Sequence, residues 1–223
     1  MRALQSLIID PFDTTSSFLV LFSASSDPLI RRWQITLAGY TQTTPTSTPL
    51  KAHETSVYAL AFPLPTPDDE DVDTNLYTAS ADGTASCLSR PHFTSTLTLP
   101  HNDYVRAIAL SSAYILTAGR SEDIKVWERE GGELRAVFEG HYEEVTGLCV
   151  VEREGGEVCV SVGIDGTVRE WELSEAGFEG MRREREERVR RERGEVEEKV
   201  VVREGVMTAE EEAELAELMD ESE

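Results

Sequence analysis

The sequence predicts an all-β protein built from four repeated units of antiparallel strands, followed by a charged helical or disordered C-terminal tail. Two observations support the repeats: one phrase recurs four times, and the runs between its copies alternate in polarity and are rich in β-branched residues. A third supports the tail, because the composition changes abruptly after residue 173. The 223 residues suffice for one substantial core or two small ones.

The recurring phrase is a β-rich run with small residues, then a turn, then an alternating run that ends in Trp or Leu. The steps between its last positions are 55, 39 and 44 residues. Asp-Gly in the second and fourth copies indicates a tight turn between two strands. The four copies are FSASSDPLIRRW (22–33), YTASADGTASCL (77–88), LTAGRSEDIKVW (116–127) and VSVGIDGTVREW (160–171).

A histidine precedes the first β-run of the last three units. These residues are His53, His101 and His141, followed by VYALAF, VRAIAL and VTGLCV. With these runs the pattern resembles the WD40 repeat, a unit of about 40–45 residues that builds the four strands of one propeller blade. The resemblance covers residues 2–173. It implies a domain at 1–173 with blades near 2–50, 51–99, 101–138 and 141–173.

The resemblance also implies a hydrogen-bonded tetrad in each blade: a loop His, a strand Ser or Thr, a turn Asp and a strand Trp. Buried polar groups of these types need partners, and this set satisfies them mutually. The fourth copy is complete, whereas the first lacks the His, the second has Leu88 for Trp and the third has Ser121 for Asp. The predicted tetrad residues are Ser23, Asp27, Trp33, His53, Thr78, Asp82, His101, Thr117, Trp127, His141, Ser161, Asp165 and Trp171.

Four such blades leave the first and the fourth with an unpacked face. Either the chain is a truncation of a longer protein, or its ring is completed by a second copy or by a partner's blades. Two copies would give eight blades, a number that propellers adopt. Closure of the ring on four blades is the third, less favoured alternative.

The tail divides into two segments. Residues 174–206 are predicted to be a charged linker or helix, in which MRREREERVRRERGEVEE (181–198) supports i,i+4 charge pairs, and 199–203 is a candidate outer strand for the fourth blade. Residues 207–223 are predicted to form an acidic amphipathic helix with a capping box at its start. Its apolar stripe, which docks on this chain or on a partner, is Leu215, Leu218 and Met219.

The charge balance narrows the classes of partner. A formal net charge of -22 argues against a binder of the nucleic-acid backbone. No run approaches the roughly 18 apolar residues of a membrane span, and the three cysteines show neither zinc-ligand nor disulfide spacing. We expect a protein of the cytoplasm or nucleus that requires no cofactor or metal.

No phosphate loop, metalloprotease or hydrolase motif is present, so we expect a non-enzymatic scaffold that binds other proteins. The alternative is a hydrolase or transferase with a site on the propeller loops. By the resemblance, partners contact the narrow face that carries the turn loops. Its candidate binding residues are Tyr58, Tyr104, Arg106, Arg120 and Ile164, with the alternative that the arginines only pair with nearby carboxylates.

Overall fold

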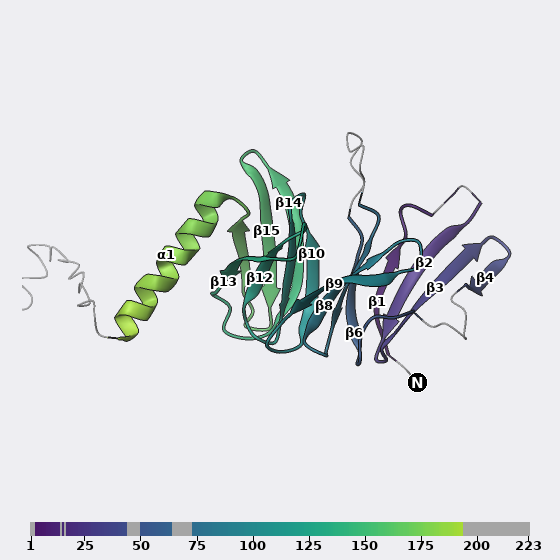
Figure 1. Ribbon diagram of the computed structural model, residues 1–223, viewed down its shortest axis with the longest axis horizontal. Helices are drawn as coiled ribbons and strands as arrows, with labels where there is room; N and C mark the ends of the chain where they lie inside the picture. The colour runs from purple at the N-terminus through teal and green to yellow at the C-terminus, as the bar shows by residue number, and fades with distance from the viewer. Residues whose placement is uncertain (1–2, 14, 16, 44–49, 64–72, 194–223) are drawn as a thin grey trace, which may run out of the picture. The chain divides into compact units, whose positions relative to one another are not determined.

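A computed structural model describes residues 3–13, 15, 17–43, 50–63 and 73–193. The chain divides into two compact units, Met1–Arg185 and Glu186–Glu223. The first unit contains four antiparallel sheets, each called a blade (Figure 1). The all-β prediction is therefore confirmed.

Blades one and two are formed from the first nine strands. Blade one has the strand order β1-β2-β3-β4, and the short β5 pairs with the start of β3. Blade two has the order β6-β7-β8-β9. The bounds are β1 Leu4–Ile9, β2 Leu19–Ser25, β3 Leu29–Thr36, β4 Gly39–Gln42, β5 Leu50–Lys51, β6 Val57–Ala61, β7 Leu76–Ser80, β8 Thr84–Ser89 and β9 Thr94–Pro100.

Blades three and four follow in the same pattern. Blade three has the order β10-β11-β12-β13, and the described part of blade four has β14-β15-β16. The bounds are β10 Val105–Leu110, β11 Tyr114–Gly119, β12 Ile124–Glu128, β13 Leu134–Phe138, β14 Val145–Arg153, β15 Gly156–Gly163 and β16 Val168–Glu172. The candidate outer strand at 199–203 lies outside the described residues.

The first strands of successive blades lie side by side. Strand β1 contacts β6, β6 contacts β10, and β10 contacts β14. In each of these strands the register with the second strand shifts just after the first paired residue, which is Leu4, Val57, Val105 or Val145. The four blades thus repeat one backbone geometry, so residues at equivalent positions can be compared directly.

The sequence predicts that blade one ends near residue 50, but the outer strand that the structure describes does not lie at that boundary. Strand β4 at Gly39–Gln42 pairs with β3 instead, and β5 adds only two residues. A tight connection from β3 is made possible by Gly39, whose φ of 143° is unfavourable for residues with a Cβ. Residues 44–49 lie outside the described part of the chain.

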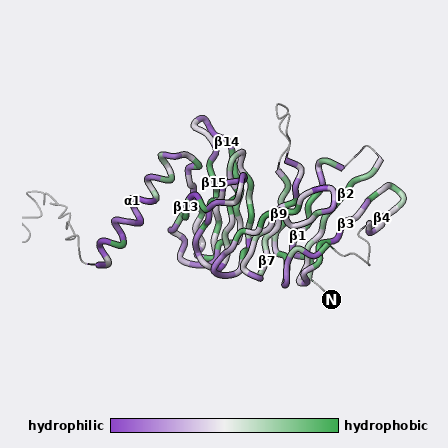
Figure 2. The backbone as a smooth tube through the Cα atoms, in the orientation of Figure 1, coloured by the Kyte–Doolittle hydropathy of each residue, from purple (hydrophilic) through white to green (hydrophobic). Residues whose placement is uncertain are grey.

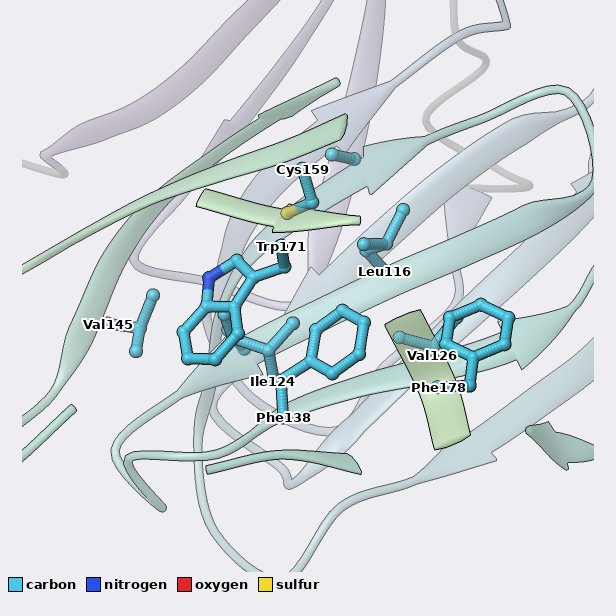
Figure 3. Packing of buried hydrophobic residues seen from close by; sticks show 10 residues of the cluster. Leu116, Ile124, Val126, Phe138, Val145, Cys159, Trp171 and Phe178 are labelled. Atoms are coloured by element: carbon cyan, nitrogen blue, oxygen red, sulfur yellow. The ribbon is translucent and has the colours of Figure 1, made fainter. Parts of the chain in front are cut away.

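Three apolar clusters fill the spaces between successive blades. The cluster between blades three and four is drawn in Figure 3, where Trp171 stacks on Phe138 with ring centroids 5.2 Å apart. Leu116 and Ile124 of blade three and Cys159 of blade four complete it at 0% exposure. Each blade is stabilised mainly by burial against its neighbours, so it needs at least one of them to fold.

The helix α1 (Glu175–Glu192) follows blade four directly. Ser174 caps its start by accepting a hydrogen bond from the Gly177 N–H at 3.1 Å. Phe178, 2% exposed, packs edge-on against Tyr114 and joins the cluster around Phe138. Beyond this turn the helix is almost entirely charged, as its hydrophilic colour in Figure 2 shows.

Candidate functional site

The tetrad of blade four connects a loop, a turn and two strands. His141 Nδ1 lies 2.9 Å from Asp165 Oδ2, and His141 Nε2 lies 2.7 Å from the Ser161 hydroxyl oxygen. The Trp171 indole N–H donates to the same hydroxyl at 2.8 Å. Asp165 also accepts hydrogen bonds from the backbone N–H groups of Tyr142 and Thr167. All four predicted residues of this copy meet in one network.

Blade two has the same network without the indole. His53 contacts Asp82 at 3.0 Å and Thr78 at 2.8 Å, while Leu88 is buried at the position of Trp171. Burial lowers the pKa of His53, although Asp82 acts in the opposite direction. Burial alone would raise the pKa of Asp82, but hydrogen bonds from Thr84 and Glu54 lower it overall. A neutral imidazole beside a carboxylate is the favoured state.

Blade one has the indole and the carboxylate but no histidine. The Trp33 N–H donates to Ser23 at 2.7 Å. The turn carboxylate of Asp27 pairs with Arg31 at 2.7 Å, and this hydrogen bond is the main reason that the pKa of Asp27 falls to about 2. Arg31 thus takes the place that the histidine has in blades two and four as the partner of the turn carboxylate.

The tetrad residues of blade three are connected less completely than those of blades two and four. Trp127 donates to Thr117 at 2.7 Å, as in the other blades. His101 Nδ1 meets only the Ser121 hydroxyl, at 3.2 Å, and its buried Nε2 is without a hydrogen-bond partner among the described side chains. Burial and the nearby Lys125 charge lower the pKa of His101 to about 4. This imidazole is therefore held neutral and incompletely hydrogen-bonded.

Arginines stack on tyrosines along the edge that carries the turn loops. Arg106 lies over Tyr58, with 4.7 Å from Cζ to the ring centroid, and Arg120 lies over Tyr104 at 5.6 Å. Their ion pairs are loose: Arg106 is 3.7 Å from Glu144 and Arg120 is 3.9 Å from Asp103. The Arg120 side chain is 61% exposed. Both guanidinium groups thus keep donors directed to solvent.

Sequence reasoning missed a third stack at this edge. Arg169 lies over Tyr142 with 5.7 Å from Cζ to the ring centroid, and Tyr142 is 77% exposed. The sequence does offer a signal for this stack, namely the aromatic residue directly after His141. The prediction missed it because it used only the positions that flank the first valine after each histidine. Ile164, at 60% exposure, lies in the adjoining turn of blade four. We call Tyr58, Tyr104, Arg106, Arg120, Tyr142, Ile164 and Arg169 the loop edge.

A cleft of about 920 Å³ lies between blades two and three, away from the tetrads. Its charged groups satisfy one another: Arg129 pairs with Asp73 at 2.6 Å, and the Tyr77 hydroxyl donates to the same carboxylate. Within the described residues, no three His, Cys, Asp or Glu side chains are placed to hold a metal ion. No helix in that part of the chain has the length and apolar character of a membrane span. The predicted tail residues Leu215, Leu218 and Met219 lie outside it.

Comparisons with known sequences agree with the repeat. Residues 132–172 match the family described as WD domain, G-beta repeat. A WD repeat-containing protein of Schizosaccharomyces pombe is 31% identical over 156 residues, which are 69% of this chain and 39% of that protein. The pre-mRNA-splicing factor PRP46 of Candida albicans is 33% identical over 81 residues, 35% of this chain and 20% of that one.

Solved structures share the fold. The structure of U3-55K has a TM-score of 0.60 at 21% identity, covering 78% of this chain and 50% of that one. The computationally designed Ika4 protein has a TM-score of 0.55 at 24% identity, covering 77% of this chain and 92% of that one. The chain spans well under half of the S. pombe relative and half of U3-55K. Repeat, blade geometry and relatives agree: this chain is made of β-propeller blades and belongs to the WD40-repeat family.

Proposed function

We propose that the protein is a non-catalytic scaffold that binds other proteins within a multi-subunit assembly, in the cytoplasm or nucleus. The family supports this role, since WD40 proteins are generally non-catalytic platforms. Two partial relatives of this chain are a splicing factor and a nuclear distribution protein, nudF of Aspergillus niger. The nudF protein is 39% identical over 67 residues, which are 30% of this chain and 14% of that protein. Partners of this scaffold include whatever completes the ring of blades.

The observation that carries the proposal is the loop edge. Tyr and Arg are enriched among residues that dominate binding energy. Here they occur as preformed stacks, so less side-chain entropy is lost on binding. On a chain with a net charge of -22, a cationic edge is also an exception that favours an acidic partner segment. We therefore propose that Arg106 and Arg120 bind carboxylates of a partner protein.

The experiment compares two charge-reversed variants with the unmodified chain. Arg106→Glu with Arg120→Glu should remove the proteins that co-purify in stoichiometric amounts. Arg182→Glu with Arg183→Glu makes the same charge change on exposed positions of α1 and should retain them. Both variants should keep their stability within about 0.5 kcal/mol, because the altered side chains are exposed. Equal recovery of partners by both variants would contradict the loop-edge proposal.

A further inference from the structure

The two faces of a blade have different neighbours. In blades two, three and four, the face with the tetrad Ser or Thr packs on the preceding blade. Thus Ile115 and Trp127 of blade three lie in one cluster with Tyr77 of blade two, and Cys159 and Trp171 of blade four lie in one with Leu116 of blade three. Every junction between blades therefore joins a tetrad face to the opposite face of the blade before it.

The tetrad face of blade one has no described neighbour. Leu4 is 63% exposed, whereas Val57, Val105 and Val145 are 0% exposed at the same position of blades two, three and four. Leu7 is 55% exposed, whereas Ile108 is 8% exposed at its equivalent position. Blade one thus exposes apolar residues at positions whose equivalents in the other blades are buried. We call this surface the leading face: Leu4, Leu7, Ile9, Leu19, Leu21, Trp33 and Ile35.

The opposite face of blade four is uncovered in the same way. Val168 is 68% exposed and Val162 is 39% exposed, whereas Ile124 and Ala118 are 0% exposed at the equivalent positions of blade three. The free thiol of Cys149 also lies on this face and is exposed. We call this surface the trailing face: Cys149, Val151, Val158, Val160, Val162 and Val168.

We propose that two copies of this chain associate head to tail, with the leading face of each copy covering the trailing face of the other. One kind of contact, used twice, then closes a ring of eight blades, and each uncovered face receives the kind of surface that its equivalents already contact. Burial of apolar surface is the main favourable contribution to association, so an uncovered pair of faces forgoes stabilisation.

The trailing face carries charged side chains among its apolar ones, since Glu170 is the cross-strand neighbour of Val160. Glu170 occupies the position that Arg32 has in blade one, and it pairs with Arg153 at 2.7 Å. Arg32 is itself paired with Asp13, which also pairs with Arg90 of blade two, so this partly exposed pair lies beside the existing junction between blades one and two. An ion pair at this position therefore accompanies a packed junction in this same chain.

The inference extends the proposed completion of the ring and is independent of binding at the loop edge. It is tested by the mass of the purified chain in solution, measured by light scattering over a range of concentrations. We expect a dimer. Leu7→Glu and Val168→Glu should each give folded monomers, whereas Leu134→Glu, an equally exposed apolar position on β13, should remain dimeric.

A mixture of the two monomeric variants gives the sharpest result. In a head-to-tail dimer the mixture restores one junction between an unmodified leading face and an unmodified trailing face, so a dimer should reappear. In a dimer that joins two leading faces, Val168→Glu alone would remain dimeric. That outcome would overturn the proposal.

The thiol of Cys149 reports on the trailing face independently. Cys87 and Cys159 are buried, so a maleimide should react with Cys149 alone. Its labelling should be at least about tenfold slower in the unmodified dimer than in Leu7→Glu. A monomer with a reactive Cys149 would overturn the proposal. A monomer with a protected Cys149 would also overturn it and would point to coverage by residues 194–223 of the same chain.

Discussion

Arg90 forms an ion pair with the fully buried carboxylate of Asp10 at 2.5 Å, and its guanidinium is surrounded by three phenylalanine rings. The pair joins blade two to the end of the first strand of blade one. The second terminal nitrogen of Arg90, Nη1, pairs with Asp13 at 3.0 Å. The three rings belong to Phe12, Phe62 and Phe93.

Removing this guanidinium should destabilise the protein strongly. In Arg90→Met the Asp10 carboxylate remains buried without this ion pair, so we expect a loss of about 3–5 kcal/mol in the free energy of unfolding. Urea denaturation at fixed protein concentration measures it. Lys51→Met is the control, because the pair of Lys51 with Glu54 is exposed and should contribute about 1 kcal/mol or less. Equal losses of unfolding free energy in the two variants would contradict the stabilising role of the buried pair between Arg90 and Asp10.

Completing the tetrad of blade three should stabilise it. Ser121→Asp places a carboxylate beside His101, as Asp82 lies beside His53 and Asp165 beside His141. A charge-assisted hydrogen bond of this kind contributes about 1.5–3 kcal/mol. The unfolding midpoint should therefore rise, and it should rise less in Ser121→Asn, which has the shape of Asp without its charge. A lower midpoint for Ser121→Asp would count against the comparison of blades.

The stability of the protein should fall as the pH decreases through the range of His101. The pKa of this imidazole is about 4 in the folded protein, below its ordinary value of 6.5. The unfolded chain binds more protons between these values, so this group adds stability above pH 6.5 and progressively withdraws it toward pH 4. The slope from one group is at most about 1.4 kcal/mol per pH unit.

The Ser121→Asp variant separates this effect from that of other acids. Its new carboxylate favours the imidazolium and should raise the pKa of His101, so its stability should depend less on pH between 4 and 6.5. Denaturation midpoints across this range, together with the NMR titration of the imidazole, measure both quantities. Parallel pH profiles for the two proteins would show that His101 is not the group responsible.

The first turn of α1 should depend on one side chain. Phe178→Ala removes a ring that is packed among Tyr114, Phe138 and the guanidinium of Arg135, and we expect a loss of about 3–5 kcal/mol. Limited proteolysis after Ser174 should become faster. Arg183→Ala, on an exposed position of the same helix, should change stability by no more than about 0.5 kcal/mol. A resistant Phe178→Ala protein would mean that other contacts hold the helix.

The strands were predictable because their signals are local. Alternation, Asp-Gly turns and the Trp positions recur along the chain, and the position of Trp171 implied that of Ser161 on the neighbouring strand. The pair of Asp10 and Arg90 is separated by 80 residues, and no local pattern records such a contact. The early turn into β4 depends on the backbone of Gly39, which its neighbours do not reveal.

The candidate site was predictable to a similar depth. The tetrads of blades two and four are implied by the resemblance to the WD40 repeat, and the structure brings these residues together. The missing side-chain partner of His101 Nε2 does not follow from the sequence, because it depends on how far the Ser121 hydroxyl replaces a carboxylate. The role of the loop edge in binding stays a prediction, since exposure and stacking describe a surface without its occupant.

The constant orientation of the blades, in which every junction joins the same two kinds of face, also bears on the evolution of such chains. Since each blade offers the same face forward and the same face backward, a duplicated or deleted repeat meets neighbours of a familiar kind on both sides. Only the curvature of the array has to adjust. A gene encoding these repeats can therefore change length one unit at a time while each intermediate protein keeps a coherent interior.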